Sequence, residues 1–229
     1  MTTPNHLFLV LSILPATVDE ETYGAWYERH LAEILETPGF VAARRYWLEP
    51  ASPERPGAEP RHLALYLLDE PDTPMAALDA RIAAGELELP DWFGEIRFTA
   101  YGGRPLEDAE LGFPDHAYLV LSHPPARFNF DQYDGWYYAH ARENLTSEGF
   151  ETVWRYQLTP TVEDPEGPHA SRHGAIYEVT RELPALRSAL TETLQARRVD
   201  IPDWMARGEG EFVSWDCLAG SPALTASPS

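Results

Sequence analysis

Residues 19–46 read DEETYGAWYERHLAEILETPGFVAARRY, and residues 129–156 read NFDQYDGWYYAHARENLTSEGFETVWRY. Both stretches carry the same residue types in the same order: a tyrosine, a tryptophan–tyrosine pair, a histidine, a glycine–phenylalanine pair and an arginine–tyrosine pair. The tryptophans, Trp26 and Trp136, are 136 − 26 = 110 residues apart, and the other shared positions keep this offset. An internal duplication therefore organises the whole chain.

Each copy begins with a predicted helix. In the first copy, apolar and aromatic residues recur at spacings of three and four, which predicts an amphipathic helix over residues 19–36. Thr17 and Glu20 have the spacing of a capping box, and Asn129 and Gln132 are the looser counterpart in the second copy. The histidine lies one turn beyond the tryptophan, on the side of the helix that faces protein.

Both copies predict the order strand, helix, strand, strand, helix, strand, which is the ferredoxin-like unit. The first copy predicts strands over residues 6–14, 40–48, 62–68 and 95–101, and a second helix that opens at Thr73–Pro74 and ends at Gly85. We expect a first ferredoxin-like α/β-barrel repeat over residues 1–102, a linker over 103–115, a second repeat over 116–219 and a flexible tail over 220–229.

The duplication also predicts how the two repeats assemble. A sheet with helices on a single face leaves its other face bare, and two such sheets can cover each other. The predicted fold class is therefore α+β, with two tandem ferredoxin-like (βαββαβ) repeats that form one body of the dimeric α/β-barrel type. The protein would then be a monomer that acts as an intramolecular pseudo-dimer, or a homodimer.

Composition limits the partners and the compartment. The formal charge is −20, and all 17 basic residues are arginine. Such a surface repels nucleic acid and anionic membranes, so neither is an expected partner. The single cysteine, Cys217, excludes an internal disulfide and fits a reducing compartment. The apolar run over residues 7–11 is too short to span a bilayer and has no basic flank. We expect a cytoplasmic protein.

The motif also resembles a known family. A Trp-Tyr-x-x-His helix followed by Pro-Gly-Phe and by Arg-Tyr on a strand resembles the EthD-like branch of the dimeric α/β-barrel superfamily, once per repeat. Members of that superfamily include cofactor-free monooxygenases, muconolactone-type isomerases and polyketide cyclases. The resemblance implies a cavity between the sheet and the first helix, with His30 and His140 as acid/base residues. The second copy departs from the pattern, because Ser147-Glu148-Gly149 replaces Thr37-Pro38-Gly39.

The residues themselves support two interpretations of the repeated histidines. Histidine titrates near neutral pH, so His30 and His140 could transfer a proton. The alternative is a core histidine that is hydrogen-bonded to a tyrosine. Tyr27 and Tyr137 could donate a hydrogen bond to a developing oxyanion, or simply pack in the core.

The remaining candidates are arginines and aromatic residues. Arg45 and Arg155 lie within strands, where a charge needs a partner, and could fix a carboxylate, a phenolate or an enolate. The alternative is a structural salt bridge. Since strand residues alternate between faces, only one of Arg45 and Tyr46 can face the cavity. Aromatic candidates for the cavity wall, which could equally be core residues, are Tyr23, Trp26, Trp47, Tyr133, Trp136 and Trp154.

No metal-binding or nucleotide-binding motif is present in the sequence. His62 begins a predicted strand, whereas His169 and His173 fall in a loop rich in glycine and proline. Cys217 has no recognisable activating context. We therefore expect no cofactor. The sequence favours a cofactor-independent enzyme that acts on a small hydrophobic oxygenated molecule, such as a polyketide or an aromatic compound. The reaction would be cyclisation, isomerisation, dehydration or decarboxylation, or oxygenation by O₂. The alternative is a non-catalytic binding or interaction protein.

Overall fold

The structure is a computed structural model that describes residues 5–52, 54–55, 59–162, 172–196 and 201–227. The first repeat contains β1 (His6–Ile13), α1 (Glu20–Leu35), β2 (Phe40–Pro50), β3 (His62–Leu68), α2 (Thr73–Ala84), a 3₁₀ turn (Phe93–Glu95) and β4 (Arg97–Pro105). The second contains β5 (His116–His123), α3 (Phe130–Asn144), β6 (Phe150–Val162), β7 (His173–Val179), α4 (Leu183–Gln195), α5 (Asp203–Ala206) and β8 (Glu211–Ala219). A short strand, β9 (Leu224–Thr225), follows.

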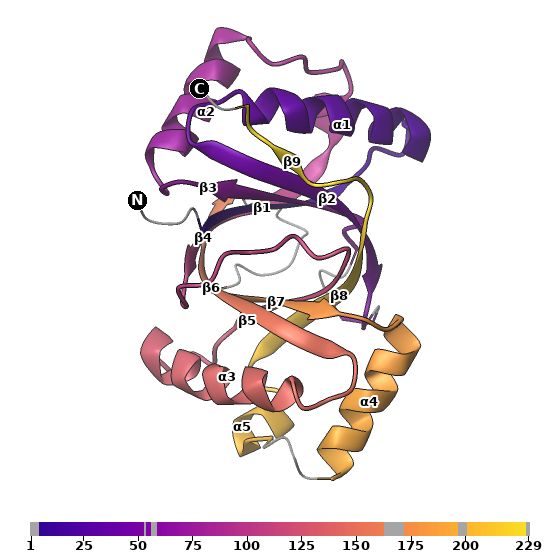
Figure 1. The fold of residues 1–229 in the computed structure, drawn as a ribbon, viewed down its shortest axis with the longest axis vertical. Helices are drawn as coiled ribbons and strands as arrows, with labels where there is room; N and C mark the ends of the chain where they lie inside the picture. Colours follow the sequence, from indigo (N-terminus) through magenta and orange to yellow (C-terminus); the bar gives the residue numbers. More distant parts are fainter. Residues whose placement is uncertain (1–4, 53, 56–58, 163–171, 197–200, 228–229) are drawn as a thin grey trace.

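The strands close into one antiparallel barrel. Their order is β3-β1-β4-β6-β7-β5-β8-β2, and β2 pairs with β3 to complete the circle. The repeats meet at two seams, where β4 pairs with β6 and β2 pairs with β8. Helices α1 and α2 cover one side of the barrel, and α3, α4 and α5 cover the opposite side (Figure 1). This confirms the predicted α+β fold with two ferredoxin-like units in one body.

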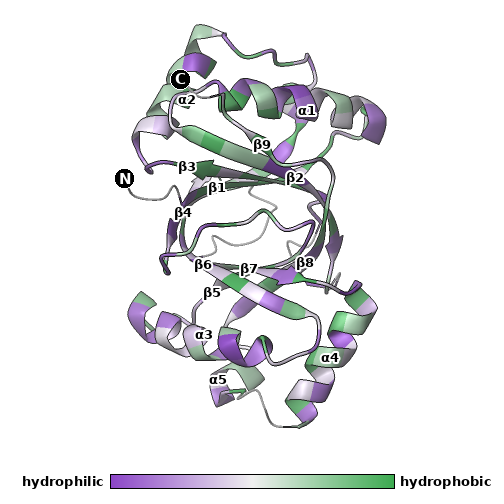
Figure 2. Ribbon diagram, viewed as in Figure 1, coloured by the Kyte–Doolittle hydropathy of each residue, from purple (hydrophilic) through white to green (hydrophobic). Residues whose placement is uncertain are grey.

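The molecule has three hydrophobic cores. One fills the barrel and draws on both repeats, with Leu9, Tyr46, Leu119 and Tyr156 among its buried members. The other two lie between the outer face of the barrel and the helices, one in each repeat. The helices of both layers carry alternating hydrophobic and hydrophilic residues (Figure 2), as expected for helices that bury one face. A filled barrel leaves the space between sheet and helices as the place for a ligand.

Helix α1 begins differently from the prediction. Asp19 is its N-cap, with the Oδ1 atom accepting a hydrogen bond from the Thr22 backbone N–H at 2.7 Å. Thr17 instead donates its hydroxyl to Glu95 at 3.0 Å, so the predicted capping box of Thr17 with Glu20 is wrong. Because α1 begins at Glu20, Asp19 and not Thr17 stands at the N-cap position. In the second copy the predicted capping box of Asn129 and Gln132 is confirmed.

Two segments are more ordered than the sequence indicated. The predicted linker over residues 103–115 begins inside β4 and buries Leu111 and Phe113 in the barrel core. Within the predicted tail, β9 pairs with β2, and Leu224 packs on the helix-side core of the first repeat. Each segment has only a few apolar residues, and these residues form no periodic pattern. The sequence therefore did not reveal their packing.

Arg44 joins both of these segments to the barrel. Its guanidinium donates to the carbonyl oxygen of Phe113 at 2.5 Å and to the Asp115 carboxylate at 2.5 Å. Its Nε donates to the carbonyl oxygen of Ser221 at 3.0 Å. One buried side chain on β2 therefore fixes the connection between the repeats and the segment that leads into β9.

Candidate functional site

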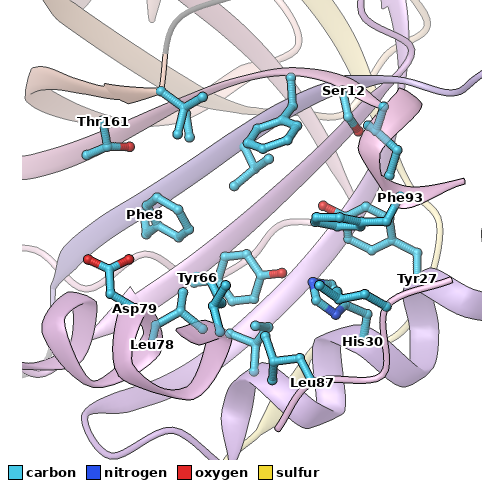
Figure 3. Close-up of a pocket in the computed structure, with 18 of the residues that line it drawn as sticks. Phe8, Ser12, Tyr27, His30, Tyr66, Leu78, Asp79, Leu87, Phe93 and Thr161 are labelled. Carbon is cyan, nitrogen blue, oxygen red and sulfur yellow. The ribbon is translucent and has the colours of Figure 1, made fainter. Parts of the chain in front are cut away.

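A cavity of about 460 Å³ lies in the first repeat, between the outer face of the sheet and helices α1 and α2. Apolar side chains dominate the lining, and Figure 3 shows Phe8, Tyr66, Leu78 and Phe93 around it. Volumes of about 300–1,000 Å³ are usual for small-molecule sites. The position agrees with the cavity that the family resemblance implied for the first repeat.

His30 lines this cavity from α1. Its imidazole stacks on the indole of Trp26, and its Nδ1 lies 3.6 Å from Glu33 Oε2, beyond hydrogen-bond distance. The Nδ1 atom is buried without a hydrogen-bond partner among the described residues. Burial lowers the pKa of His30 from 6.5 to about 4. The ring is therefore neutral at neutral pH, and the residue lines an apolar cavity.

Two pairs of hydroxyl groups add polar atoms to the cavity lining. Tyr27, from α1, forms a hydrogen bond with Tyr66 from β3, and burial raises the pKa of both phenols. Ser12 and Tyr23 are linked at 2.8 Å between their oxygens. These four residues line the same cavity as His30. Protonated phenols at this depth can donate hydrogen bonds to an oxygen of a bound molecule.

Helix α1 also brings Trp26 into the wall. Its indole N–H donates to the carbonyl oxygen of Glu88 at 3.1 Å, which fixes the ring against the chain that follows α2. Trp92 packs edge-on against it, with ring centroids 5.2 Å apart. Of the sequence-predicted residues of the first repeat, Tyr23, Trp26, Tyr27 and His30 thus meet in one cavity wall.

The second repeat preserves much of this arrangement. His140 stacks on Trp136 with centroids 4.8 Å apart, and burial lowers its pKa to about 4. Tyr133 donates to Ser122 at 2.7 Å, as a counterpart of the Tyr23–Ser12 pair. Tyr137 forms a hydrogen bond with Tyr177, as a counterpart of the Tyr27–Tyr66 pair.

The two repeats differ in the side chain that lies beside each histidine. Asn144 lies one turn beyond His140, and its Nδ2 is 3.3 Å from both His140 Nε2 and the Tyr177 hydroxyl. The corresponding residue of the first repeat is Ile34, which lines the cavity and cannot form a hydrogen bond through its side chain. His140 is therefore held in a polar network that the first repeat lacks.

The other predicted candidates lie outside the cavity lining. Arg45 projects from β2 toward α1, with its guanidinium carbon 5.2 Å from the Tyr27 ring centroid on the side away from the barrel core. Tyr46 faces the barrel interior. Trp47 is 37% exposed and packs on His62, whereas Trp154 is buried in the barrel core.

Arg155 also lies outside the lining, in an ion-pair cluster of the second repeat. It contacts Asp134 and Glu107, each at 2.5 Å. Its cluster includes His173, whose Nε2 lies 3.4 Å from Asp134.

A second repeated pair of histidines escaped the sequence analysis. His62 and His173 each begin a strand and are completely buried. The prediction that His173 lies in a loop is wrong, because β7 begins at this residue; His169 falls outside the described residues. The pair is 173 − 62 = 111 residues apart, the offset that also relates Tyr66 to Tyr177, so the repeat spacing could have revealed it. Burial, reinforced by Arg45, lowers the pKa of His62 to about 3.

The described residues give little support for a metal site or for a reactive cysteine. Within them, no three His, Cys, Asp or Glu side chains gather as a metal site. Cys217 is buried, which raises the pKa of its thiol and disfavours the reactive thiolate. Across the ranges that the structure describes, no helix is both long enough and apolar enough to cross a bilayer.

No protein-family model and no curated protein sequence matches this chain. Solved structures, in contrast, match the chain in fold. One is an anthrone oxidase-like protein, 13% identical, with a TM-score of 0.52 over 99% of this chain and 96% of that one. Another is a mutant chlorite dismutase from Candidatus Nitrospira defluvii in complex with cyanide, 8% identical, with a TM-score of 0.53 over 95% of this chain and 90% of that one. At these identities the likeness concerns the fold. The chain therefore adopts the dimeric α/β-barrel fold, with both halves of the barrel supplied by one polypeptide.

Proposed function

We propose that the first repeat is a cofactor-independent enzyme site in which His30 transfers a proton to or from a small hydrophobic oxygenated molecule. The observation that carries the proposal is that His30, a neutral imidazole, lines an apolar cavity of about 460 Å³, while its Nδ1 has no hydrogen-bond partner among the described residues. The EthD-like resemblance of the helix motif points to the same residue.

The apolar lining supports a hydrophobic substrate. Three exposed apolar side chains, Ile82, Leu89 and Val162, belong to the cavity lining, so a hydrophobic molecule would meet apolar surface as it enters. The ring of Trp26 offers a flat surface, which suits an aromatic or polyketide-like compound. In Figure 3, Asp79 and Thr161 lie on the far side of the cavity from His30, so the two regions can bind different ends of one molecule.

The proposed chemistry begins with proton removal. A neutral His30 can accept a proton from a carbon next to a carbonyl group, and the electrons move onto the carbonyl oxygen. The hydroxyl of Tyr27 or Tyr66 would stabilise that oxygen by donating a hydrogen bond. Glu33, 3.6 Å from Nδ1, would favour the protonated ring once it forms. Return of the proton elsewhere gives isomerisation, and carbon–carbon bond formation gives cyclisation. Loss of a β-hydroxyl group gives dehydration, and attack of the carbanion on O₂ gives oxygenation from the same intermediate. Decarboxylation would instead form the enolate by loss of CO₂, and a protonated His30 would then donate the proton that completes the reaction.

A second candidate is a binding protein that holds such a molecule without chemistry. Its support is the low pKa of His30, since burial makes this ring a weak base. A bound substrate that brings an anionic oxygen close to the ring would raise that pKa. The two candidates therefore differ in the state of His30 when the ligand is bound.

His30→Gln separates the two functions. Glutamine keeps a hydrogen-bonding side chain but cannot transfer protons at neutral pH. Once a screen of aromatic and polyketide-like compounds has found a ligand, calorimetry measures its affinity and product analysis measures turnover. General acid/base catalysis contributes about 10²–10⁴-fold, so turnover should fall by that factor while affinity is kept. Exposed Arg29→Gln, on the same helix, is the matched control.

The outcomes of this experiment are distinct. Wild-type turnover in His30→Gln would overturn the role of His30. Tight binding without any turnover by the wild-type protein would favour the binding protein. Cofactor independence is checked separately, by metal analysis and by an absorption spectrum of the purified protein; a stoichiometric metal, flavin or haem would contradict it.

A further inference from the structure

The cavity of the first repeat has a charged residue at the end away from His30. Among the described residues that line the cavity, Asp79 is the sole one with a formal charge at neutral pH, since His30 is neutral there. In Figure 3, Asp79 and Thr161 lie beyond Phe8 as seen from His30. The cavity thus has two chemically different ends, and the proposed chemistry uses only the end at His30.

Helix α2 places Asp79 at this end. Its neighbour Leu78 is buried in the core between the helices and the sheet, whereas Asp79 is exposed and still belongs to the cavity lining. Met75 and Ile82, four residues before Asp79 and three residues after it, line the cavity too. Residues at these spacings share one face of a helix. The carboxylate therefore stands where it can meet both water and a bound molecule.

The protein does not balance the charge of Asp79. Among the described residues, no hydrogen bond or ion pair involves this carboxylate. Arg81, two residues further along the helix, is engaged elsewhere, since it donates to the carbonyl oxygen of Glu33 at 2.7 Å and to Thr37 Oγ1 at 2.8 Å. An ionised carboxylate only accepts hydrogen bonds, so a bound molecule with a donor group can supply the missing partner.

Part of this end of the cavity comes from the second repeat. Strand β6 pairs with β4 across the seam, where Val162 is the partner of Ala100, and both residues line the cavity. Thr161 precedes Val162 and adds a hydroxyl group to the lining. A hydroxyl group can donate and accept, whereas the Asp79 carboxylate can only accept. Together they suit a hydroxyl group on the ligand, which can donate to one and accept from the other.

The corresponding end of the second repeat carries the opposite charge. Ala51 corresponds to Thr161, since 161 − 110 = 51, and its carbonyl oxygen accepts a hydrogen bond from Arg187 of α4. Burial raises the pKa of the Tyr118 phenol, and the charge of Arg187 partly offsets this rise. A carboxylate thus stands at this end in the first repeat and a guanidinium in the second, so the two repeats favour different groups here.

We propose that Asp79 selects the substrate class of the cavity: molecules that carry a hydroxyl group, and no acid group, at the end remote from His30. The inference rests on the proposed function for which end reacts, whereas the selection itself concerns binding. A ligand hydroxyl donates to the Asp79 carboxylate, and such charge-assisted hydrogen bonds are stronger than neutral ones. A ligand carboxylate would instead bring two negative charges together, in a chain whose formal charge is already −20.

Three compounds with the same fused-ring frame test the selection. They are 2-naphthol, which has a hydroxyl group, 2-methoxynaphthalene, which lacks the donor, and 2-naphthoate, which has an acid group. Calorimetry of the full-length protein at neutral pH and constant ionic strength measures each affinity. Because a hydrogen bond to a charged group is lost, 2-methoxynaphthalene should bind about tenfold more weakly than 2-naphthol, and 2-naphthoate more weakly still.

Two substitutions of Asp79 separate its two roles. Asp79→Leu removes the acceptor, so the preference for 2-naphthol over 2-methoxynaphthalene should fall to within about twofold. Asp79→Asn keeps the shape without the charge and should strengthen the binding of 2-naphthoate about tenfold. Asp72→Asn is the matched control, because Asp72 is exposed at the start of the same helix and lies outside the cavity lining. It should change each affinity by less than about twofold.

Several outcomes would overturn the inference. These are an unchanged preference for 2-naphthol in Asp79→Leu, unchanged binding of 2-naphthoate in Asp79→Asn, and no binding of any of the three compounds by the wild-type protein. The proposed enzyme is judged separately, by turnover. His30→Gln should keep the preference for 2-naphthol whether or not it lowers turnover. Loss of the preference in His30→Gln would place the hydroxyl group at His30 and overturn the selection by Asp79.

Discussion

The imidazole of His30 lies almost parallel to the indole of Trp26, with ring centroids 4.6 Å apart and an angle of 21° between the planes. The same stacking recurs between His140 and Trp136, at 4.8 Å and 16°. One turn of helix separates the members of each pair, so the helix backbone itself sets the geometry. Stacking on an indole fixes the ring and removes water from one of its faces.

The buried histidines predict how stability depends on pH. The pKa of His30 and of His140 is about 4 in the folded protein, against 6.5 when exposed. Between these values the unfolded chain binds more protons than the folded one, so stability is full above about pH 6.5 and falls as the pH drops toward 4. At pH 4.5 each histidine should cost on the order of 2–3 kcal/mol. Urea unfolding at several pH values measures this, and His30→Gln should flatten the curve. An unchanged slope would contradict the prediction.

The two histidines should differ in their effect on turnover. His140 is held by Asn144 at 3.3 Å, whereas Ile34 occupies the same position beside His30. We therefore expect His140→Gln to leave turnover within about twofold of the wild type, while His30→Gln lowers it about 10²–10⁴-fold. Ile34→Asn should lower turnover too, since it gives His30 the amide partner of His140. Equal losses from His30→Gln and His140→Gln would show that both repeats act.

Arg44 should be important for stability. Its guanidinium donates to the carbonyl oxygens of Phe113 and Ser221 and to the Asp115 carboxylate. Arg44→Met keeps most of the volume but leaves two carbonyl groups and a carboxylate without their donor. The expected loss is about 2–4 kcal/mol in the free energy of unfolding, measured with urea. Arg104→Met is the control, because Arg104 forms an exposed contact with Gln157 and its loss should cost less than about 1 kcal/mol.

Strand β9 should contribute to the stability of the first repeat. Leu224 packs on the core between α1 and the sheet, and its strand pairs with Ala43 of β2. Ending the chain after Ser221 removes this strand and should lower the free energy of unfolding by about 1–3 kcal/mol. A chain that ends after Thr225 keeps the pairing and is the control. Equal stability of the two truncated proteins and the full chain would show that β9 is only loosely associated.

The sequence predicted the fold well because the determining signals are local and occur twice. The three-and-four spacing around Trp26 and the apolar runs of the strands each depend on a few neighbouring residues. Duplication then implied the partner sheet, since two half-covered sheets satisfy each other. Likewise, His30, Tyr27 and Trp26 share one helical stripe, so their meeting in one wall follows from the helix alone.

Strand residues were harder to place. The register of β2 against β3 shifts between Phe40 and Ala42, and that of β6 against β7 shifts between Phe150 and Thr152. Such bulges reverse the alternation of inward and outward side chains, so counting from the turn cannot say which face Trp47 or Trp154 occupies. Tyr66 joins Tyr27 only through packing between distant segments, which no spacing in the sequence reveals.

Because the two repeats belong to one chain, each can change without the other, which the identical chains of a symmetric dimer cannot do. When two identical chains close a barrel, each substitution is made twice, and both sites change together. Here Asn144 contacts His140 while Ile34 brings no hydrogen-bonding side chain to His30, and Asp134 pairs with Arg155 while Gly24 brings no carboxylate to Arg45. A single polypeptide can therefore keep one repeat as a rigid structural unit while substitutions change the residues of the other repeat.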